Sequence, residues 1–185
     1  MSHASLHRDA GGVLREWAAP TNDQEALRKS FIKLLEEYDD ATARSCFPNH
    51  LTAGVIVFSI DISQVLLNLH GKAQRWFAFG GHLEDGDDTL LDAAAREGRE
   101  ESGINSLMLL PDPVHLSCHP VDFCDSRGRV HHHDVRFAAM APPGSVPEVS
   151  HESSDVRWFG VDDLPTDEPD MLDLISLAAD RLRRS

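Results

Sequence analysis

The spacing of apolar residues near the start of the chain predicts one helix. From residue 22 onward, apolar side chains recur every three or four positions, as on the buried face of an amphipathic helix. Asn22 or Asp23 is placed to cap its first turn, because either side chain can accept a bond from a free backbone N–H. Residues 1–20 are interpreted as a frayed terminus. Residues 1–48 are therefore predicted to be an N-terminal extension with one helix.

Beyond this extension, short runs of β-branched and apolar residues predict strands. The predicted strands occupy residues 54–60, 65–69, 76–79, 107–110, 114–121, 130–140 and 156–161. Helical segments interrupt them without the regular alternation of a doubly wound sheet, which favours a mixed sheet with helices packed on its faces. Residues 49–185 are therefore predicted to form one α/β (α+β) domain, which closes with a helix over 170–184.

The clearest helical pattern lies between Thr89 and Ser102. Thr89 and Asp92 resemble a capping box in which Asp replaces the usual Glu. Gly103 follows directly and can adopt the left-handed conformation that ends a helix. Small residues such as Gly98, on the face away from the helix charges, predict that this helix lies close against the sheet.

Composition and charge narrow the class of protein. The 185 residues suit one domain, and 41% apolar with 26% charged residues is ordinary for a globular chain. The formal net charge of −14, from 17 basic and 31 acidic residues, disfavours nucleic acid as a partner, because that binding needs cations that displace phosphate counterions. An acidic protein that acts on an anion would need a bridging cation.

Cellular context is predicted from what the sequence lacks. No apolar run approaches the roughly 20 residues of a membrane span, and the first residues lack the apolar core of a signal peptide. The three cysteines, Cys46, Cys118 and Cys124, cannot all pair with one another and form no Cys-x-x-Cys motif. These features predict a cytoplasmic protein with reduced cysteines and no membrane partner, and a homodimer is left open.

The helix that follows Thr89 carries three carboxylates within a sector of about 100°. They are Glu97, Glu100 and Glu101. Like charges at these spacings repel one another, and Arg96 alone cannot neutralise three of them. Mg²⁺ is held by a few carboxylates together with substrate phosphates, and the glycine pair Gly80-Gly81 would let backbone carbonyls approach the same ion. A solvated acidic helix face is the alternative interpretation.

The segment from Gly80 to Ile104 resembles the Nudix box, whose pattern is Gly-x5-Glu-x7-Arg-Glu-U-x-Glu-Glu-x-Gly-U, with U aliphatic. The matching residues are Gly81, Arg96, Glu97, Glu100, Glu101, Gly103 and Ile104. Asp87 takes the place of the first box glutamate with one extra residue before Arg96, or Asp88 keeps the spacing and the insertion precedes it. Gly98 replaces an aliphatic residue, at a cost of about 1 kcal/mol relative to Ala inside a helix.

The resemblance implies an α/β/α sandwich with a mixed sheet and a hydrolase acting on phosphorus-containing acid anhydrides. Such enzymes use Mg²⁺ or Mn²⁺ to cleave a diphosphate linkage in a nucleoside diphosphate derivative by water attack on phosphorus. Glu97, Glu100 and Glu101 would hold the metal, with the Gly80 carbonyl as a further ligand. Arg96 would orient Glu100 or pair with the acid at position 87 or 88.

Two glutamates are candidates for the general base. Glu97 lies on the helix, where packing fixes its position, whereas Glu152 lies in the long polar loop 141–154, as in many Nudix enzymes that place a glutamate there. Loop placement suits a base that arrives only in the closed complex, so both Glu97 and Glu152 are held as catalytic. Glu148 is the other acid of this loop.

Two other functions are compatible with the resemblance. One is a non-catalytic nucleotide-sensing Nudix module, against which the intact acids argue. The other is an isoprenoid-diphosphate isomerase of the same fold, which needs a reactive cysteine facing the substrate. Cys46 lies before the first core strand, and Cys118 and Cys124 have no matching context, so this alternative is disfavoured.

Histidines and aromatic residues outside the box are further candidates. His131 and His133 share one face of a predicted strand and are candidates for a wall of the substrate pocket, with a solvated strand end as the alternative. Trp76 and Phe79 are candidates for stacking on a base, with a core role as the alternative. A zinc interpretation uses residues whose spacing fits no compact finger: His115, Cys118, His119, Cys124, His131, His132, His133 and Asp134. Cations that could steady phosphates are Lys72, Arg75, Arg127, Arg129 and Arg136.

Overall fold

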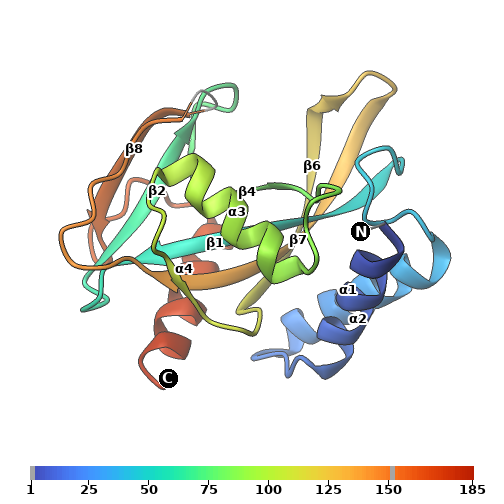
Figure 1. The fold of residues 1–185 in the computed structure, drawn as a ribbon, viewed down its shortest axis with the longest axis horizontal. Helices are drawn as coiled ribbons and strands as arrows, with labels where there is room; N and C mark the ends of the chain where they lie inside the picture. The colour runs from blue at the N-terminus through green and yellow to red at the C-terminus, as the bar shows by residue number, and fades with distance from the viewer. Residues whose placement is uncertain (1–2, 151–152) are drawn as a thin grey trace.

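The computed structural model describes residues 3–150 and 153–185 and combines four helices with one eight-stranded sheet (Figure 1). The elements in chain order are α1 (His3–Glu16), α2 (Asn22–Glu37), β1 (Asn49–Phe58), β2 (Gln64–His70), β3 (Trp76–Phe77), β4 (Phe79–His82), α3 (Leu90–Ser102), β5 (Met108–Leu109), β6 (His115–Asp125), β7 (Gly128–Met140), β8 (Ser153–Gly160) and α4 (Pro169–Leu182). No helix in these described ranges has the length and apolar character needed to cross a membrane.

The sheet is mixed, as the element order predicts. β1 and β7 run parallel from the pair Asn49 and His131 to the pair Phe58 and Met140, while the other strand pairs are antiparallel. β1 has two partners on its other edge, because β2 pairs with its last residues and β4 pairs with residues 52–55. This divergence places the glycines of β4 beside the middle of β1, beneath α3.

Helices cover both faces of the sheet, which confirms the α+β fold class. One core cluster joins α1, α2 and α3 to the sheet through side chains that include Leu14, Phe31 and Val55. A second cluster packs α4 against the opposite face through Leu174, Ile56 and neighbouring residues. Figure 1 shows α3 in front of the sheet and α4 behind it.

The N-terminal extension departs from the prediction. Residues 3–16 form a helix, and Leu6, Ala10 and Leu14 are buried in the same core as α3, so the frayed terminus and the single helix are wrong. Burial of these three side chains at i, i+4 and i+8 offsets the low helix propensity of Gly11 and Gly12. A carboxylate oxygen of Asp9 also accepts a 2.8 Å hydrogen bond from the Leu90 N–H, which ties α1 to the first turn of α3.

The start of α2 differs in its cap. Thr21 is the N-cap, and its hydroxyl accepts a bond from the Gln24 N–H, so neither Asn22 nor Asp23 caps the helix. The Gln24 carboxamide reaches β6, where its nitrogen donates to the Leu116 carbonyl at 3.0 Å and its oxygen accepts from the Leu116 N–H at 2.6 Å. The 6% exposed Gln24 side chain therefore anchors α2 to the edge of the sheet.

Candidate functional site

The helix that carries the carboxylates is capped at both ends as its sequence predicts. The Thr89 hydroxyl accepts from the Asp92 N–H at 3.1 Å, which confirms Thr89 as the N-cap, and it donates to the Asp92 carboxylate at 2.8 Å. Gly103 has φ of 72° and closes the helix in the left-handed region, where an L residue would be strained. Because both ends are fixed, the side chains of α3 project from a rigid frame.

Gly98 brings this helix close to β1. A Cβ at residue 98 would lie 2.7 Å from a Val55 methyl group and 3.0 Å from a Leu107 methyl group. The departure from the Nudix pattern therefore has a packing cause, because an aliphatic side chain at this position would push α3 away from the sheet. The close approach predicted for Gly98 is confirmed.

The three carboxylates have unequal environments. Glu101 is 6% exposed, and its carboxylate accepts a 2.8 Å hydrogen bond from the Gly80 N–H. The Glu97 side chain is 13% exposed, whereas that of Glu100 is 60% exposed. A Cβ at Gly81 would lie 2.5 Å from a Glu97 carboxylate oxygen, so only glycine leaves room for that carboxylate. A uniformly solvated acidic face is thus excluded, because two of the three acids turn toward β4.

Arg96 fixes the loop that leads into α3. Its guanidinium donates to both carboxylate oxygens of Asp87, at 3.0 and 2.9 Å, and to the His82 carbonyl at 2.9 Å. It also donates to Glu97 at 2.8 Å and reaches Glu100 only at 3.4 Å. Hydrogen bonding to buried Asp87 raises the pKa of Arg96 further above its usual value. Arg96 therefore pairs with Asp87, and its contact with Glu100 is the weaker one.

The choice between the two aspartates follows from this geometry. Asp87 is 5% exposed and also accepts a 2.8 Å bond from the Glu84 N–H, so it occupies the place of the first box acid. Asp88 is exposed. The extra residue of this sequence is therefore accommodated between Asp87 and the helix.

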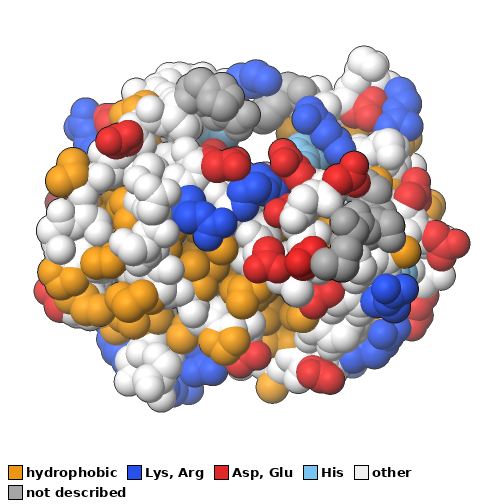
Figure 2. All heavy atoms as spheres, viewed as in Figure 1, with side chains coloured by type: hydrophobic (Ala, Val, Ile, Leu, Met, Phe, Trp, Pro, Cys, Tyr) orange, Lys and Arg blue, Asp and Glu red, His pale blue; other side chains and the backbone are white. Residues whose placement is uncertain are grey.

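The three glutamates of α3 and Arg96 line a cavity of about 310 Å³. Its lining residues are Arg44, Gly81, His82, Glu84, Arg96, Glu97, Glu100, Glu101 and Ser150. Figure 2 shows acidic side chains gathered around a hollow on this face, with basic side chains between them. Such a set offers oxygen donors for a divalent cation and positive charge for an anion in the same space.

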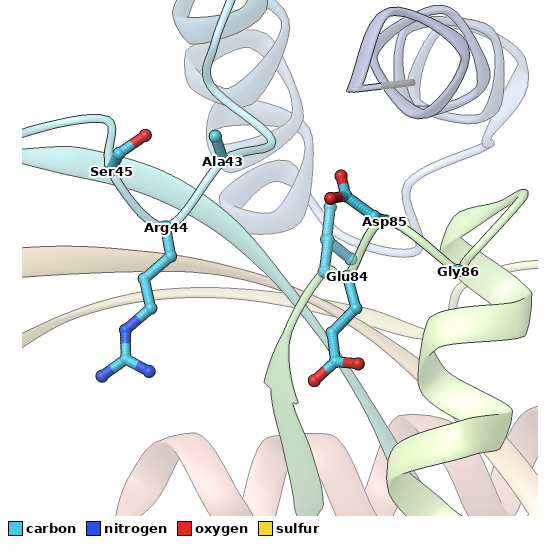
Figure 3. A pocket seen from close by; sticks show the side chains of 7 residues that line it. Ala43, Arg44, Ser45, Glu84, Asp85 and Gly86 are labelled. Atoms are coloured by element: carbon cyan, nitrogen blue, oxygen red, sulfur yellow. The ribbon is translucent and has the colours of Figure 1, made fainter. Parts of the chain in front are cut away.

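A second opening of about 500 Å³ adjoins the first and shares Arg44 and Glu84 with it. Figure 3 shows the Arg44 side chain on one side of this opening and Glu84 with Asp85 on the other. Arg44 belongs to the connection between α2 and β1, far in sequence from the box. Sequence reasoning missed it, because no motif links that connection to α3.

The cations proposed from the sequence lie elsewhere. Arg136 is buried and pairs with Asp134 and Asp170, while Arg75 pairs with Glu168. Arg127 and Arg129 pair with the nearby aspartates 125 and 122. Neither these four nor Lys72 is among the residues described as lining the carboxylate cavity.

The predicted substrate-binding side chains are also outside this lining. Phe79 is 1% exposed within the core, so it presents no surface on which a base could stack, and that prediction is corrected. Trp76 packs edge-on against Phe159, with the two ring centroids 4.7 Å apart. His133 is buried against Phe31, and the His131 N–H donates to the Pro48 carbonyl. The cavity is lined by Gly81 rather than Gly80, whose N–H is bound to Glu101.

Of the two loop glutamates, Glu148 lies against the end of α3. Glu148 packs its Cβ over Gly103, and its N–H donates to the Ser102 carbonyl at 2.8 Å. Glu152, the loop candidate for the base, lies outside the described residues. Ser150, two residues earlier in the sequence, lines the cavity.

Comparison with known proteins identifies the family. A family model described as the NUDIX domain matches residues 48–178. A Nudix-family hydrolase from Clostridium perfringens superposes with a TM-score of 0.56 at 22% identity, over 73% of this chain and 97% of that one. A C. elegans Ap4A hydrolase gives 0.58 at 20% identity, over 73% and 98%. An E. coli dihydroneopterin triphosphate pyrophosphohydrolase gives 0.54 at 15% identity, over 73% and 96%.

No curated protein matches the chain in sequence. At these identities the solved structures establish the fold alone, whereas the family model spans most of the chain and includes the capped helix with its three glutamates. The chain therefore belongs to the Nudix family and is a Nudix hydrolase.

Proposed function

We propose that this protein is a pyrophosphohydrolase that depends on Mg²⁺ or Mn²⁺ and cleaves a diphosphate linkage in a nucleoside diphosphate derivative. The observation that carries the proposal is the cavity, which Glu97, Glu100 and Glu101 line together with Gly81 and Arg44. The Glu97 carboxylate lies against Gly81. Hydrolase neighbours named for Ap4A and for dihydroneopterin triphosphate support the substrate class.

The donor set fits a hard divalent cation. All three candidate ligands are carboxylates, and Arg96, the nearest guanidinium, is already bound to Asp87. Glu97 and Glu101 are held with little exposure, where mutual repulsion is screened less than in water. When bound, the ion neutralises diphosphate oxygens and acidifies water.

The residues of this chain then have separable tasks. Glu101 is fixed by the Gly80 N–H, and Glu97 by Arg96, so both hold their positions before substrate arrives. In hydrolysis the water oxygen forms a bond to phosphorus, the bridging P–O bond breaks, and the water proton passes to a carboxylate. Arg96 acts as a positioning residue, because its contacts are to Asp87 and Glu97.

Arg44 is proposed to bind the phosphates or the leaving group of the substrate. It lines both openings, and a guanidinium matches phosphate geometry through paired N–H groups. Arg44→Gln is expected to raise KM more than it lowers kcat. An unchanged KM would remove Arg44 from the substrate site.

The metal site is tested with a matched pair of variants. Glu100→Gln removes one carboxylate charge from the cavity. Glu36→Gln is the control, because it removes one carboxylate charge from α2, away from the cavity. The two side chains are similarly exposed, 60% for Glu100 and 62% for Glu36. Calorimetric titration with Mg²⁺ and Mn²⁺ is expected to show binding that Glu100→Gln loses and Glu36→Gln keeps. Equal binding by both variants would contradict the metal assignment.

A substrate screen accompanies the titration. Release of nucleoside monophosphate or phosphate is measured with dinucleotides, nucleotide sugars and nucleoside triphosphates in the presence of each ion. Turnover of a dinucleotide or nucleotide sugar that requires the ion is expected. Tight binding of nucleotides without turnover would instead identify a sensing module.

The identity of the base is tested by comparing Glu152→Gln with Glu97→Gln. Loss of the base is expected to lower kcat by about 10²–10⁴ while metal affinity stays near that of the wild type. Full turnover by Glu152→Gln would make the loop glutamate a surface acid and leave the role to Glu97.

A further inference from the structure

Four strands bring three imidazoles and one thiol together at the end of the sheet away from α4. The side chains are His50 from β1, His82 from β4, Cys124 from β6 and His132 from β7, and their ligand atoms all lie within 4.8 Å of one another. His82 follows Gly81, which faces Glu97, so side-chain alternation points the His82 ring to the opposite face of the strand. His82 also lines the carboxylate cavity, where its backbone carbonyl accepts from Arg96, so the two sites adjoin through this residue.

Four of the six distances among the ligand atoms lie near the edge lengths of a coordination tetrahedron, and the other two are at most 4.8 Å. The Nε2 atoms of His50 and His82 are 3.2 Å apart. The Cys124 sulfur lies 3.3 Å from His82 Nε2, 3.4 Å from His132 Nε2 and 4.0 Å from His50 Nε2. Metal–nitrogen bonds of about 2.0–2.1 Å and a metal–sulfur bond of about 2.3 Å separate tetrahedral ligands by about 3.3 Å for two nitrogens and about 3.6 Å for sulfur and nitrogen.

The tautomer of His50 leaves its Nε2 atom free of a proton, as a metal ligand requires. His50 is fully buried, and its Nδ1 lies 3.0 Å from the Cys46 carbonyl, to which only an N–H can bond. The proton of a neutral ring is thus on Nδ1, and the lone pair of Nε2 points at the other three residues.

A bulge delivers the cysteine. β6 and β7 keep a regular register from His115 to Val121, and the register then shifts before Asp125 pairs with Gly128. Bulges of this kind redirect a side chain out of the regular alternation. Arg44 donates to the Cys124 carbonyl at 3.3 Å, which helps to hold the bulged backbone in place.

We propose that His50, His82, Cys124 and His132 bind one zinc ion in a closed structural site. Four protein ligands leave no open position for water, which is typical of structural zinc, and the nitrogen and sulfur donors distinguish this site from the oxygen donors of the carboxylate cavity. On binding, the Cys124 thiol releases its proton to solvent and ligates as the thiolate.

A neighbouring combination, His119 with His132 and Asp134, is less suited to the ion. Asp134 already accepts bonds from Arg136 and from the Thr52 hydroxyl, so ligation would break a buried ion pair. That combination also lacks a thiolate. The two sets share only His132, so a change at Cys124 tests the first set and a change at His119 tests the second.

The proposed ion would brace the floor of the carboxylate cavity. The His82 ring is one of the four proposed ligands, and the His82 backbone carbonyl accepts a 2.9 Å hydrogen bond from Arg96. Four strands far apart in the sequence would be tied together at one point. The inference does not rest on the proposed catalytic function, because its four ligands include none of the three carboxylates of α3 and its ion is a different one.

The test is performed on the full chain without a polyhistidine tag. After purification without chelators, elemental analysis is expected to find one equivalent of zinc. Replacement by Co²⁺ is expected to produce the visible absorption of a tetrahedral site and a thiolate charge-transfer band. Cys124→Ser is expected to lose that charge-transfer band, whereas the matched control Cys118→Ser, an exposed cysteine on the same strand, is expected to keep it.

A second measurement avoids any dependence on the folding of variants. The wild-type chain is alkylated with and without added Zn²⁺, and the modified cysteines are identified by mass spectrometry. Protection of Cys124 with no change at Cys118 supports the site. The proposal is overturned if Zn²⁺ fails to protect Cys124, if the charge-transfer band survives in Cys124→Ser, or if His119→Ala abolishes binding while Cys124→Ser does not.

Discussion

Gly81→Ala should damage the carboxylate site without disturbing the fold. Gly81 has no positive φ, so alanine fits its backbone, but the added Cβ would lie 2.5 Å from a Glu97 carboxylate oxygen. Ordinary contact begins near 3.4 Å, so the carboxylate must move by about 0.9 Å, the difference between these two distances. A misplacement of about 1 Å in a catalytic arrangement costs about 100-fold in rate.

The assay measures kcat on the best substrate of the screen, Mn²⁺ affinity by titration, and the melting temperature. We expect kcat to fall by about 100-fold and Mn²⁺ affinity to weaken, with a small change in melting temperature. Gly12→Ala is the control, because a Cβ there meets nothing within 4 Å, and it should leave kcat unchanged.

A double variant identifies the route of the effect. If the methyl group acts through Glu97, then Gly81→Ala should cost little further activity in a Glu97→Gln background, since the two changes share one interaction. Full activity of Gly81→Ala, or costs that add independently in the double variant, would refute the reasoning.

Three further predictions concern packing and pH. Gly98→Ala should destabilise by about 1–2 kcal/mol in urea unfolding, since crowding against Val55 outweighs the helix propensity of Ala; a stabilised variant would contradict this. Leu14→Ala should cost about 2–5 kcal/mol, because the residue is fully buried, and a loss below about 1 kcal/mol would detach α1 from the core. Burial, and then the charge of Arg136, lower the pKa of His115 from 6.5 to about 4. Between these two pH values the unfolded chain binds a proton at His115 that the folded chain does not. The free energy of unfolding should therefore fall by about 1.4 kcal/mol per unit as pH drops from 6.5 toward 4. His115→Gln should flatten that slope by about one proton, and an unchanged slope would count against it.

Local signals account for the parts of the site that could be predicted. The Thr89 cap, the glycine stop and the three glutamates of α3 lie within one short segment, where helical periodicity alone determines which side chains share a face. The partner of Arg96 stayed open between two adjacent aspartates. Burial of Asp87 decides it, and burial depends on how the whole loop packs.

Long-range pairing explains most of what the sequence did not reveal. Arg44 and Glu84 meet at one opening because the connection after α2 lies beside the loop after β4. His50 and His82 are 32 residues apart and touch only because β1 and β4 pair, so no spacing pattern contains them. The sequence does not predict α1, because two adjacent glycines weaken its helical pattern. The helix is stabilised instead by the packing of its apolar side chains against elements later in the chain.

The carboxamide of Gln24 has a consequence for association between molecules. β6 pairs with β7 on one side, and its other side would present unpaired backbone groups to which a strand of another chain could add. At Leu116 both of these groups, the N–H and the carbonyl, are already occupied by Gln24. One buried side chain thus takes the place of a neighbouring strand for the length of one residue, and at Leu116 it blocks the edge-to-edge pairing by which sheets aggregate.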